Sequence, residues 1–338
     1  MPVKNSLMST IGGWFSREPS VPVAVAVFGK SAVVNGHQDL AGDATKSLLE
    51  FARTSYYEGA LPNCSGWEAD LRDADRILAT HLVRWSGGRL TVARVAAVAE
   101  GGATTKAFAP MISCVEVDGA HGVELMPAID EALAGIEQPL LDARPENWAS
   151  ILAPVRSSLL ERLQRSASKV PSRSESDAVA TEHLARLGES ATAWAESLAE
   201  ELNLEMPSAA GASRVASKPA TLGCRTAEAP RTCGDISSDL RGWTAFLCTA
   251  APGLSEWWMF GGESLASIRV VIGHPRDRDF TCLWRSRESA GLVPQPLPES
   301  GRARVIERTS IWLKSRSIEP KPATPASDSA SGAAGGSE

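Results

Sequence analysis

The sequence lacks the features that define membrane-embedded and secreted proteins. No run of about 18 consecutive apolar residues is present, the length that a membrane-spanning helix requires. The apolar stretch at 21–28 is short and is interrupted by Pro22, and the N-terminus has no adequate signal sequence. We therefore expect a cytoplasmic protein without an integral membrane segment.

Paired cysteines and concentrated basic charge are also missing. The six cysteines form no Cys-x-x-Cys pair and no spacing typical of zinc sites, so we expect buried or half-buried thiols and no metal or other cofactor. A formal net charge of −6 and a pI near 5.6 argue against nucleic acid as a partner, because phosphate binding needs clustered Lys and Arg.

What is present indicates a globular chain. Its 338 residues, 43% of them apolar and 22% charged, are enough to bury one large core or two modest ones. Residues 1–22 are predicted to be a flexible N-terminus, and residues 315–338, rich in Pro, Ala, Ser and Gly, a disordered tail.

Residues 23–125 predict an α/β core. The apolar run Val23–Phe28 is typical of a strand buried on both faces. Asp43 is a candidate N-cap for a helix that ends near Gly59, and a second helix is expected over 67–80. Three further strands are expected at 81–86, 89–98 and 109–117, the first two joined by a Gly87-Gly88 hairpin turn.

Residues 126–206 predict a mainly helical insertion. Pro127 suits a first helical turn, and Pro154 is expected to break the helical stretch. A single helix is expected from about Ser176 onward, because apolar residues recur at spacings of three and four. These residues are Leu184, Leu187, Ala191, Trp194, Leu198 and Leu202.

Residues 207–234 change to Ala, Ser, Pro, Gly and Thr and predict a mobile linker. Strand signals return within residues 235–314, at 243–249, 256–260, 268–272 and 279–284. Four short strands make a thin core, so we expect them to complete the first sheet. The predicted fold class is therefore α/β (α+β), an antiparallel sheet with flanking helices and a helical insertion.

Two loops contain residues that suggest chemistry. His37, Asp39 and Asp43 could bind a metal or move a proton, although no further ligand has a recognisable spacing. Gly29-Lys30-Ser31 has the end of a phosphate-binding loop without its first glycine. No Gly-x-Ser-x-Gly motif is present, so covalent catalysis has no candidate nucleophile.

Tryptophan is unusually abundant, with ten residues against two tyrosines, and Trp is a favoured anchor at protein interfaces. We expect most of these side chains in the core. Trp257 and Trp258 are adjacent, so they are expected on opposite faces of a strand, with one of them exposed.

Several motifs follow one another in the order found in a known family. They are Phe28-Gly29-Lys30 at the end of the first strand, Gly36-His37-Gln38-Asp39, Ser65-Gly66-Trp67-Glu68, Lys106-Ala107-Phe108-Ala109-Pro110-Met111, and Trp257-Trp258-Met259 before Gly261-Gly262. With them, residues 23–125 and parts of 240–285 resemble the TagF-like accessory proteins of type VI secretion. The loop after Lys30 departs from the family in its greater length and in having Ala32 in place of a proline.

The resemblance implies a longin- or profilin-like α/β sandwich and a non-catalytic role. TagF-like proteins regulate a bacterial contractile injection system after translation, through protein–protein interaction in the cytoplasm. The implied partner is a forkhead-associated scaffold or another component of the secretion system. The residues expected to contact it are Phe28, Gly29, Lys30, Gly36, His37, Asp39, Lys106, Phe108 and Pro110.

Two other hypotheses stay open at this point. One is an enzyme with a metal or acid–base site near His37 and Asp39. The other is a structural subunit that self-associates through the helical insertion around Trp194.

Overall fold

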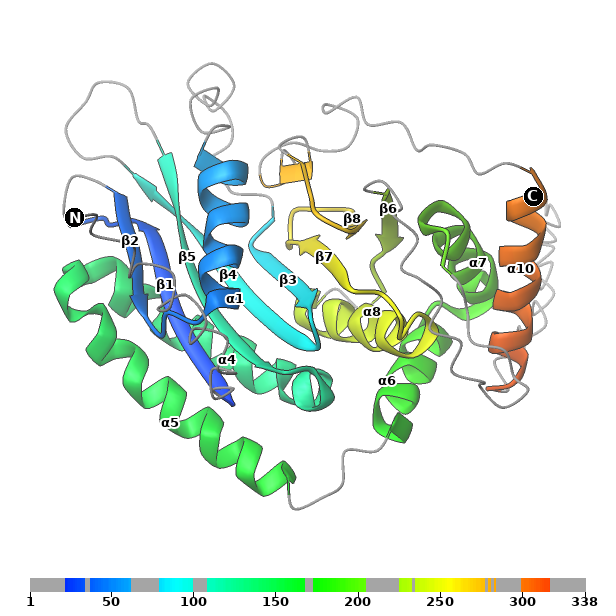
Figure 1. The fold of residues 1–338 in the computed structure, drawn as a ribbon, viewed down its shortest axis with the longest axis horizontal. Coiled ribbons are helices and arrows are strands. Elements are labelled where there is room, and N and C mark those ends of the chain that lie inside the picture. The colour runs from blue at the N-terminus through cyan, green and yellow to red at the C-terminus, as the bar shows by residue number, and fades with distance from the viewer. Residues whose placement is uncertain are drawn as a thin grey trace, which may run out of the picture.

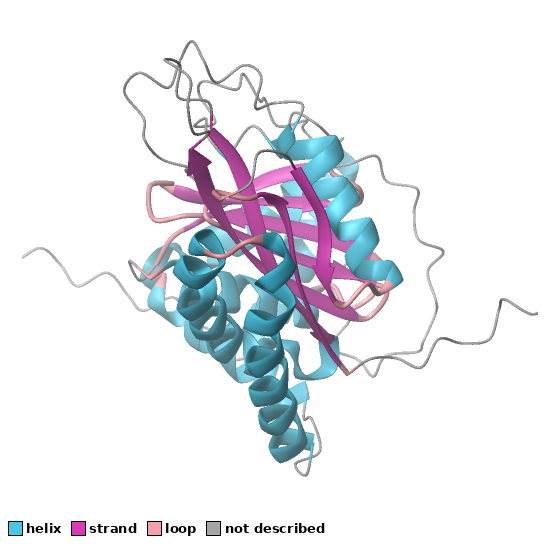
Figure 2. Ribbon diagram, turned by 90° about the vertical axis from the view of Figure 1, so that its left-hand side faces the viewer, coloured by secondary structure: helices cyan, strands magenta, loops and turns pink. Residues whose placement is uncertain are grey.

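The computed structural model describes residues 22–33, 37–61, 79–99, 108–167, 173–204, 225–232, 235–276, 279–280, 283 and 299–316. Within these residues one eight-stranded antiparallel sheet has helices on both faces (Figures 1 and 2). The predicted α/β class, an antiparallel sheet with flanking helices, is confirmed.

The eight strands come from both ends of the chain. They are β1 (Val23–Lys30), β2 (His37–Gly42), β3 (His81–Ser86), β4 (Arg89–Ala99), β5 (Phe108–Asp118), β6 (Arg225–Pro230), β7 (Glu256–Gly261) and β8 (Ser267–Ile272). Their order across the sheet is β2-β1-β5-β4-β3-β7-β8-β6. The pairing of β3 with β7 therefore joins the strands before the helical region to those after it.

Strand β1 is buried along its whole length, as its sequence predicts. Val23, Val25 and Val27 belong to the larger apolar cluster on one face of the sheet. The alternate residues Ala24, Ala26 and Phe28 belong to the smaller cluster on the other face. This alternation follows from the two-residue period of a strand, and it explains why the run contains no polar residue until Lys30.

One face of the sheet is covered by α1 (Lys46–Ala52) and the π-helix η1 (Arg53–Ala60) that continues it. The N-cap is Thr45 rather than the predicted Asp43. The Thr45 hydroxyl accepts a hydrogen bond from the Leu48 amide at 3.1 Å, whereas the Asp43 carboxylate accepts one from the Val25 amide at 2.9 Å. The predicted hairpin between β3 and β4 is confirmed, with positive φ at Gly87 and Gly88.

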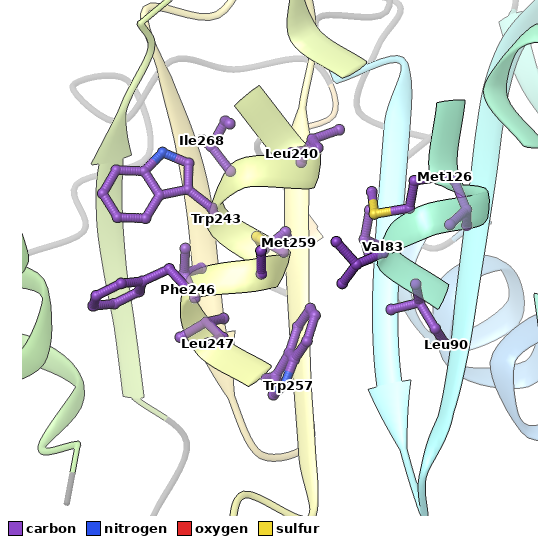
Figure 3. Packing of buried hydrophobic residues seen from close by; sticks show 14 of the residues in the cluster. Val83, Leu90, Met126, Leu240, Trp243, Phe246, Leu247, Trp257, Met259 and Ile268 are labelled. Atoms are coloured by element: carbon purple, nitrogen blue, oxygen red, sulfur yellow. The ribbon is translucent and has the colours of Figure 1, made fainter. Parts of the chain in front are cut away.

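The other face is covered by the remaining helices, which contribute to the larger apolar cluster. They are α4 (Gly119–Asp142), α5 (Trp148–Ala167), α6 (Arg173–Arg186), α7 (Ala191–Leu202), α8 (Ile236–Ala250) and α10 (Glu299–Lys314), with short 3-10 turns η2 (Pro145–Asn147) and η3 (Gly188–Ser190). Figure 3 shows part of this core, in which side chains of α8 lie beside those of β7, and Met126 of α4 beside Val83 and Leu90.

Two predictions about prolines are wrong. Helix α4 begins at Gly119, where the Asp118 carboxylate caps it, so Pro127 lies inside the helix rather than in its first turn. Pro154 lies inside α5 and does not break it. In both helices the apolar residues packed on the sheet favour a continuous helix over the local preference of proline.

The single helix predicted from Ser176 is two helices. Helix α6 ends at Arg186, and Gly188, with φ +62°, turns the chain into α7. Both helices contribute residues to one buried cluster. The apolar residues therefore keep their spacing in the sequence across the turn, although the helix itself is interrupted. Trp194 is 39% exposed, unlike most of the predicted stripe.

Most of the other wrong predictions of secondary structure concern the later part of the chain. Residues 225–230 of the predicted linker form β6, and residues 243–249 belong to α8 rather than to a strand. Asp279 and Phe280 lie in a 3-10 turn instead of a strand, and α10 had not been predicted. The strands at 256–260 and 268–272 are confirmed, and they share one sheet with β1–β5.

The adjacent tryptophans on β7 face opposite sides of the sheet, as expected. The expectation that one of them is exposed is wrong, because both are buried. Trp257 stacks on Trp85 of β3 with ring centroids 6.2 Å apart, and Trp258 stacks on Phe51 of α1 at 5.3 Å.

Some predictions fall outside the described residues. These concern residues 1–21, most of the predicted helix at 67–80, and residues 317–338. No helix in the described part of the chain has the length and apolar character needed to cross a membrane.

Candidate functional site

The structure brings the predicted contact segments together at one end of the sheet. Lys30, at the end of β1, pairs with His37, at the start of β2. Gly29 pairs with Met111, next to Pro110 near the start of β5. We call this end, formed by residues 28–33, 56–57 and 110–111 and the first residues of β2, the Lys30 corner. Gly36 and Lys106 lie outside the described residues, as do the side chains of His37, Asp39 and Phe108.

Gly29 allows the strands of the corner to approach one another. Its φ is +105°, a conformation that other residues rarely adopt. A Cβ atom at this position would lie 2.5 Å from the Pro110 carbonyl oxygen and 3.0 Å from a ring carbon of Tyr56. The Phe-Gly-Lys motif therefore has a structural reason for its glycine.

Strand β2 carries a bulge within the predicted contact loop. Val27 pairs with Ala41 and Gly29 with Gln38, so two residues of β2, Asp39 and Leu40, stand opposite Phe28 alone. A bulge bends the strand and changes the direction of its side chains, and bulges are frequent at sheet edges and beside functional sites. The metal or acid–base site at His37 and Asp39 stays a hypothesis, because the side chains of both residues lie outside the described part of the chain.

Buried aromatic residues pack beneath the surface of the Lys30 corner. The Phe28 ring packs edge-on against Phe51 and Tyr56, with centroids 6.0 and 6.1 Å apart. Tyr56 lies in η1, and π-helical turns are rare and often occur at functional sites. Lys30 and Ser31 are only 5% and 2% exposed, so they belong to the framework of the corner rather than to its surface.

Two apolar side chains are exposed at the corner. Val33, whose amide donates a hydrogen bond to the Ser31 hydroxyl at 3.2 Å, is 46% exposed. Tyr57, whose ring packs edge-on against Tyr56 at 5.1 Å, is 38% exposed. A buried framework that presents an aliphatic and an aromatic side chain is suited to binding a protein surface.

A second polar cluster, which sequence reasoning missed, lies where α4 crosses β3 and β4. The Thr80 hydroxyl lies 2.8 Å from Nδ1 of His81, and Nε2 of His81 lies 3.0 Å from the Asp130 carboxylate. Arg94 donates to the same carboxylate oxygen at 3.0 Å and to Glu137 at 3.2 Å. We call Thr80, His81, Arg94, Asp130 and Glu137 the His81 network.

The His81 network fastens α4 to the sheet. Burial alone would raise the pKa of Asp130, but the hydrogen bonds and charges of His81 and Arg94 outweigh it and lower the pKa to about 2. The carboxylate is therefore ionised and paired at neutral pH. The hairpin turn at Gly87-Gly88 already implies that His81 stands opposite Arg94, but no sequence signal places Asp130 beside them.

Charged residues also hold α1 to the opposite face. Arg84 donates to the Ser47 carbonyl and to Glu256, both at 3.1 Å, and its guanidinium lies over the Trp258 ring at 5.2 Å. Glu116, which is buried, accepts hydrogen bonds from Arg89 at 3.2 and 3.3 Å. The contacts of Arg84 link α1, β3 and β7, and those of Arg89 link β4 to β5, so we assign them to the framework of the fold.

The described cysteines show no sign of reactivity. Burial raises the pKa of the Cys114 thiol far above its ordinary value, with a further contribution from Glu116, and burial raises that of Cys248 to about 12. Within the described ranges no group of three or more His, Cys, Asp or Glu side chains is arranged to hold a metal ion.

No protein-family model, curated protein or solved structure matches this chain.

Proposed function

We propose that this chain is a protein-binding regulator or assembly factor of a type VI-like contractile secretion system, and that it contacts its partner through the Lys30 corner. The role is non-catalytic, is exerted after translation, and belongs to the cytoplasmic part of the machine. The partner is a forkhead-associated scaffold or another secretion-system component.

The convergence of the motif segments carries this proposal. The Phe-Gly-Lys motif and the start of β2 are close in the sequence and pair as neighbouring strands, whereas the segment around Pro110 is far from both in the sequence and pairs with the motif at the same end of the sheet. Residues that resemble a family at several places and then meet in space favour a shared site over chance similarity.

The surface chemistry of the corner supports a protein partner. Val33 and Tyr57 are two of the five large apolar side chains exposed in the described part of the chain, and both lie on buried supports. An exposed aromatic residue held by a rigid neighbour loses little conformational entropy on binding, so it makes a good interface anchor.

The polar networks support a non-catalytic role. His81, Asp130 and Arg94 are hydrogen-bonded to one another, Arg84 donates to the Ser47 carbonyl of α1, and Glu116 is paired with Arg89. Each of these groups has a structural task, and none of them belongs to the Lys30 corner.

Affinity purification of the tagged chain from its native cells, followed by quantitative mass spectrometry, tests the proposal. We expect secretion-system components with the wild type and their loss from a Val33→Asp, Tyr57→Ala double variant. Both side chains are exposed, so the variant should fold, which circular dichroism and thermal unfolding would verify.

Ile311→Asp is the matched control. Ile311 is 43% exposed on α10, at the opposite side of the molecule from β1 and β2 (Figure 1), and it should leave capture unchanged. Absence of secretion components from the wild-type sample would refute the proposed function. Equal capture by the double variant would instead refute only the assignment of the corner.

A further inference from the structure

A second buried histidine, His183, lies at the contact between α6 and α8. Its side chain is 3% exposed. The ring rests directly on the backbone of α8, because a Cβ atom at Gly242 would lie 2.1 Å from its Cγ. Trp243 packs edge-on against it, with centroids 4.8 Å apart. Only a glycine at position 242 leaves room for the imidazole.

The ring of His183 is packed, and within the described part of the chain it makes no hydrogen bond. Neither Nδ1 nor Nε2 has a hydrogen-bond partner among the described residues. A neutral imidazole carries one donor and one acceptor, so both are buried without a partner of their own. Leaving such groups unsatisfied costs free energy, and placing a positive charge on the ring in this position would cost more.

Among the described residues, Asp239 of α8 and Arg186 of α6 are the charged groups that act on this ring. On α8, Asp239 is fully buried; its carboxylate accepts hydrogen bonds from the amide and hydroxyl of Thr232, and Arg231 lies 3.5 Å away. On α6, Arg186 adds a positive charge and is itself paired with Glu182. At the far end of α6, Asp177 is paired with Arg316 of the chain after α10. One carboxylate oxygen of Asp239 thus accepts from Thr232 and the other pairs with Arg231, and the charge of Asp239 opposes the effect of burial on the His183 pKa only in part.

We propose that His183 is an acid-sensitive latch between α6 and α8, and that protonation of its ring releases α6 from α8. At neutral pH the uncharged ring fills the space above Gly242 and holds the helices together. When the ring gains a proton, the charge is better solvated outside this contact, so the open state is favoured. Opening exposes Trp243 and the buried face of α6, including Ala180 and Leu184.

The size of the effect follows from the two protonation equilibria. Burial lowers the pKa of His183 to about 4; Asp239 opposes the shift and Arg186 adds to it. In an open state the ring regains a pKa near its ordinary value of about 6.5. The ratio of open to closed α6 should then rise by roughly 50- to 100-fold between pH 7.5 and pH 4.5.

Hydrogen–deuterium exchange of the full chain at these two pH values, corrected for the intrinsic pH dependence of amide exchange, tests the latch. In the wild type we expect α6 amides to lose protection by this factor, while α5, which contains no histidine, should lose much less. In His183→Phe a planar aromatic ring is kept and the proton site is removed, so α6 should lose no more protection than α5. Unchanged α6 protection in the wild type, or the same acid-induced loss in His183→Phe, would overturn the proposal.

A second measurement keeps the latch testable if the variant does not fold. Exchange of the imidazole C2 hydrogen, followed by mass spectrometry, reports the titration of individual histidines in the wild type. We expect a midpoint near pH 4 for His183. A midpoint near pH 6.5 would mean that the closed contact does not resist protonation, and the latch would be refuted.

Discussion

The region of β1–β5 and the region formed by α6, α8 and β6–β8 each contain a buried histidine, and the two rings differ in their hydrogen bonds. His81 lies on β3, and His183 lies on α6 against α8. His81 and His183 are 4% and 3% exposed, so burial does not distinguish them. His81 has a partner at each ring nitrogen, whereas His183 has none among the described residues. The comparison teaches that the partners of a buried imidazole, rather than its depth, decide whether it strengthens a contact or makes it sensitive to acid.

The largest effect is expected in the His81 network. Asp130→Ala leaves His81 and Arg94 without their shared carboxylate and should lower the free energy of unfolding by about 3 kcal/mol, the low end for a broken buried ion pair because Asp130 is partly exposed. Chemical denaturation at pH 7 measures it. Glu131→Ala is the neighbouring control; Glu131 is 79% exposed and 4.0 Å from Arg162, so its removal should cost less than about 0.5 kcal/mol.

The next effect concerns the pH dependence of stability. Because the folded pKa of His183 lies below its unfolded value, the unfolded state binds a proton first as pH falls from about 6.5 to 4. The contribution of His183 is fully present above pH 6.5 and is lost over this window, by about 2 to 3 kcal/mol. Denaturation at pH 7.5 and 4.5 should show this loss in the wild type and its absence from His183→Phe.

Asp130 should respond to acid in a lower pH range than His183, because its pKa in the folded protein is about 2. Its stabilisation is present above the ordinary carboxyl value and is lost only as pH falls below about 4. An acid-induced loss of stability that is already complete above pH 6, or one that His183→Phe leaves intact, would contradict the difference between the two histidines.

A smaller effect is expected at the Lys30 corner. Gly29→Ala forces a side chain into a φ of +105° and against the Pro110 carbonyl, so the free energy of unfolding should fall by about 1 to 3 kcal/mol. Gly135→Ala in α4 is a control with the opposite sign. Nothing lies within 4 Å of a Cβ there, and the helix should gain about 0.5 to 1 kcal/mol. Thermal unfolding of both variants measures these changes. A higher melting temperature for Gly29→Ala, or a lower one for Gly135→Ala, would contradict the prediction.

The smallest effect is expected at Trp194. Its side chain is 39% exposed on α7, so Trp194→Ser should change the free energy of unfolding by less than about 1 kcal/mol. Sedimentation over a range of protein concentrations tests whether Trp194 takes part in self-association. A wild-type mass that rises with concentration, and a variant mass that does not, would favour the self-association hypothesis.

The two parts also differ in how well the sequence predicts them. The strands β1 and β3–β5 were predicted because their apolar runs are long and because Gly87-Gly88 specifies a hairpin. Helix α8 was missed because the run at 243–249 is nearly continuous in apolar residues, and such a run fits a buried strand as well as a buried helix. The helical spacing becomes visible only when Ile236 and Leu240 are taken together with Trp243 and Leu247. Strand β6 was missed because small residues, Ala227 and Ala229, become core only beside α7 and β8.

The candidate site was predictable only in part. The motifs around Lys30 and Pro110 identified segments of the corner, and the hairpin register implied the His81–Arg94 pair. Three contacts depend on tertiary packing that no local pattern encodes. They are the approach of Tyr56 to Gly29, the position of Asp130, and the packing of His183 on Gly242.

Secretion by native cells tests the central claim most directly. Cells that lack this chain should assemble a different number of contractile sheaths, counted by fluorescence of a labelled sheath subunit: more if the chain restrains assembly, fewer if it promotes it. A chromosomal Val33→Asp, Tyr57→Ala variant should reproduce that change at normal protein level, while Ile311→Asp should behave as the wild type. If loss of the chain leaves sheath number and secretion unchanged, the chain is not a regulator or assembly factor of this machine.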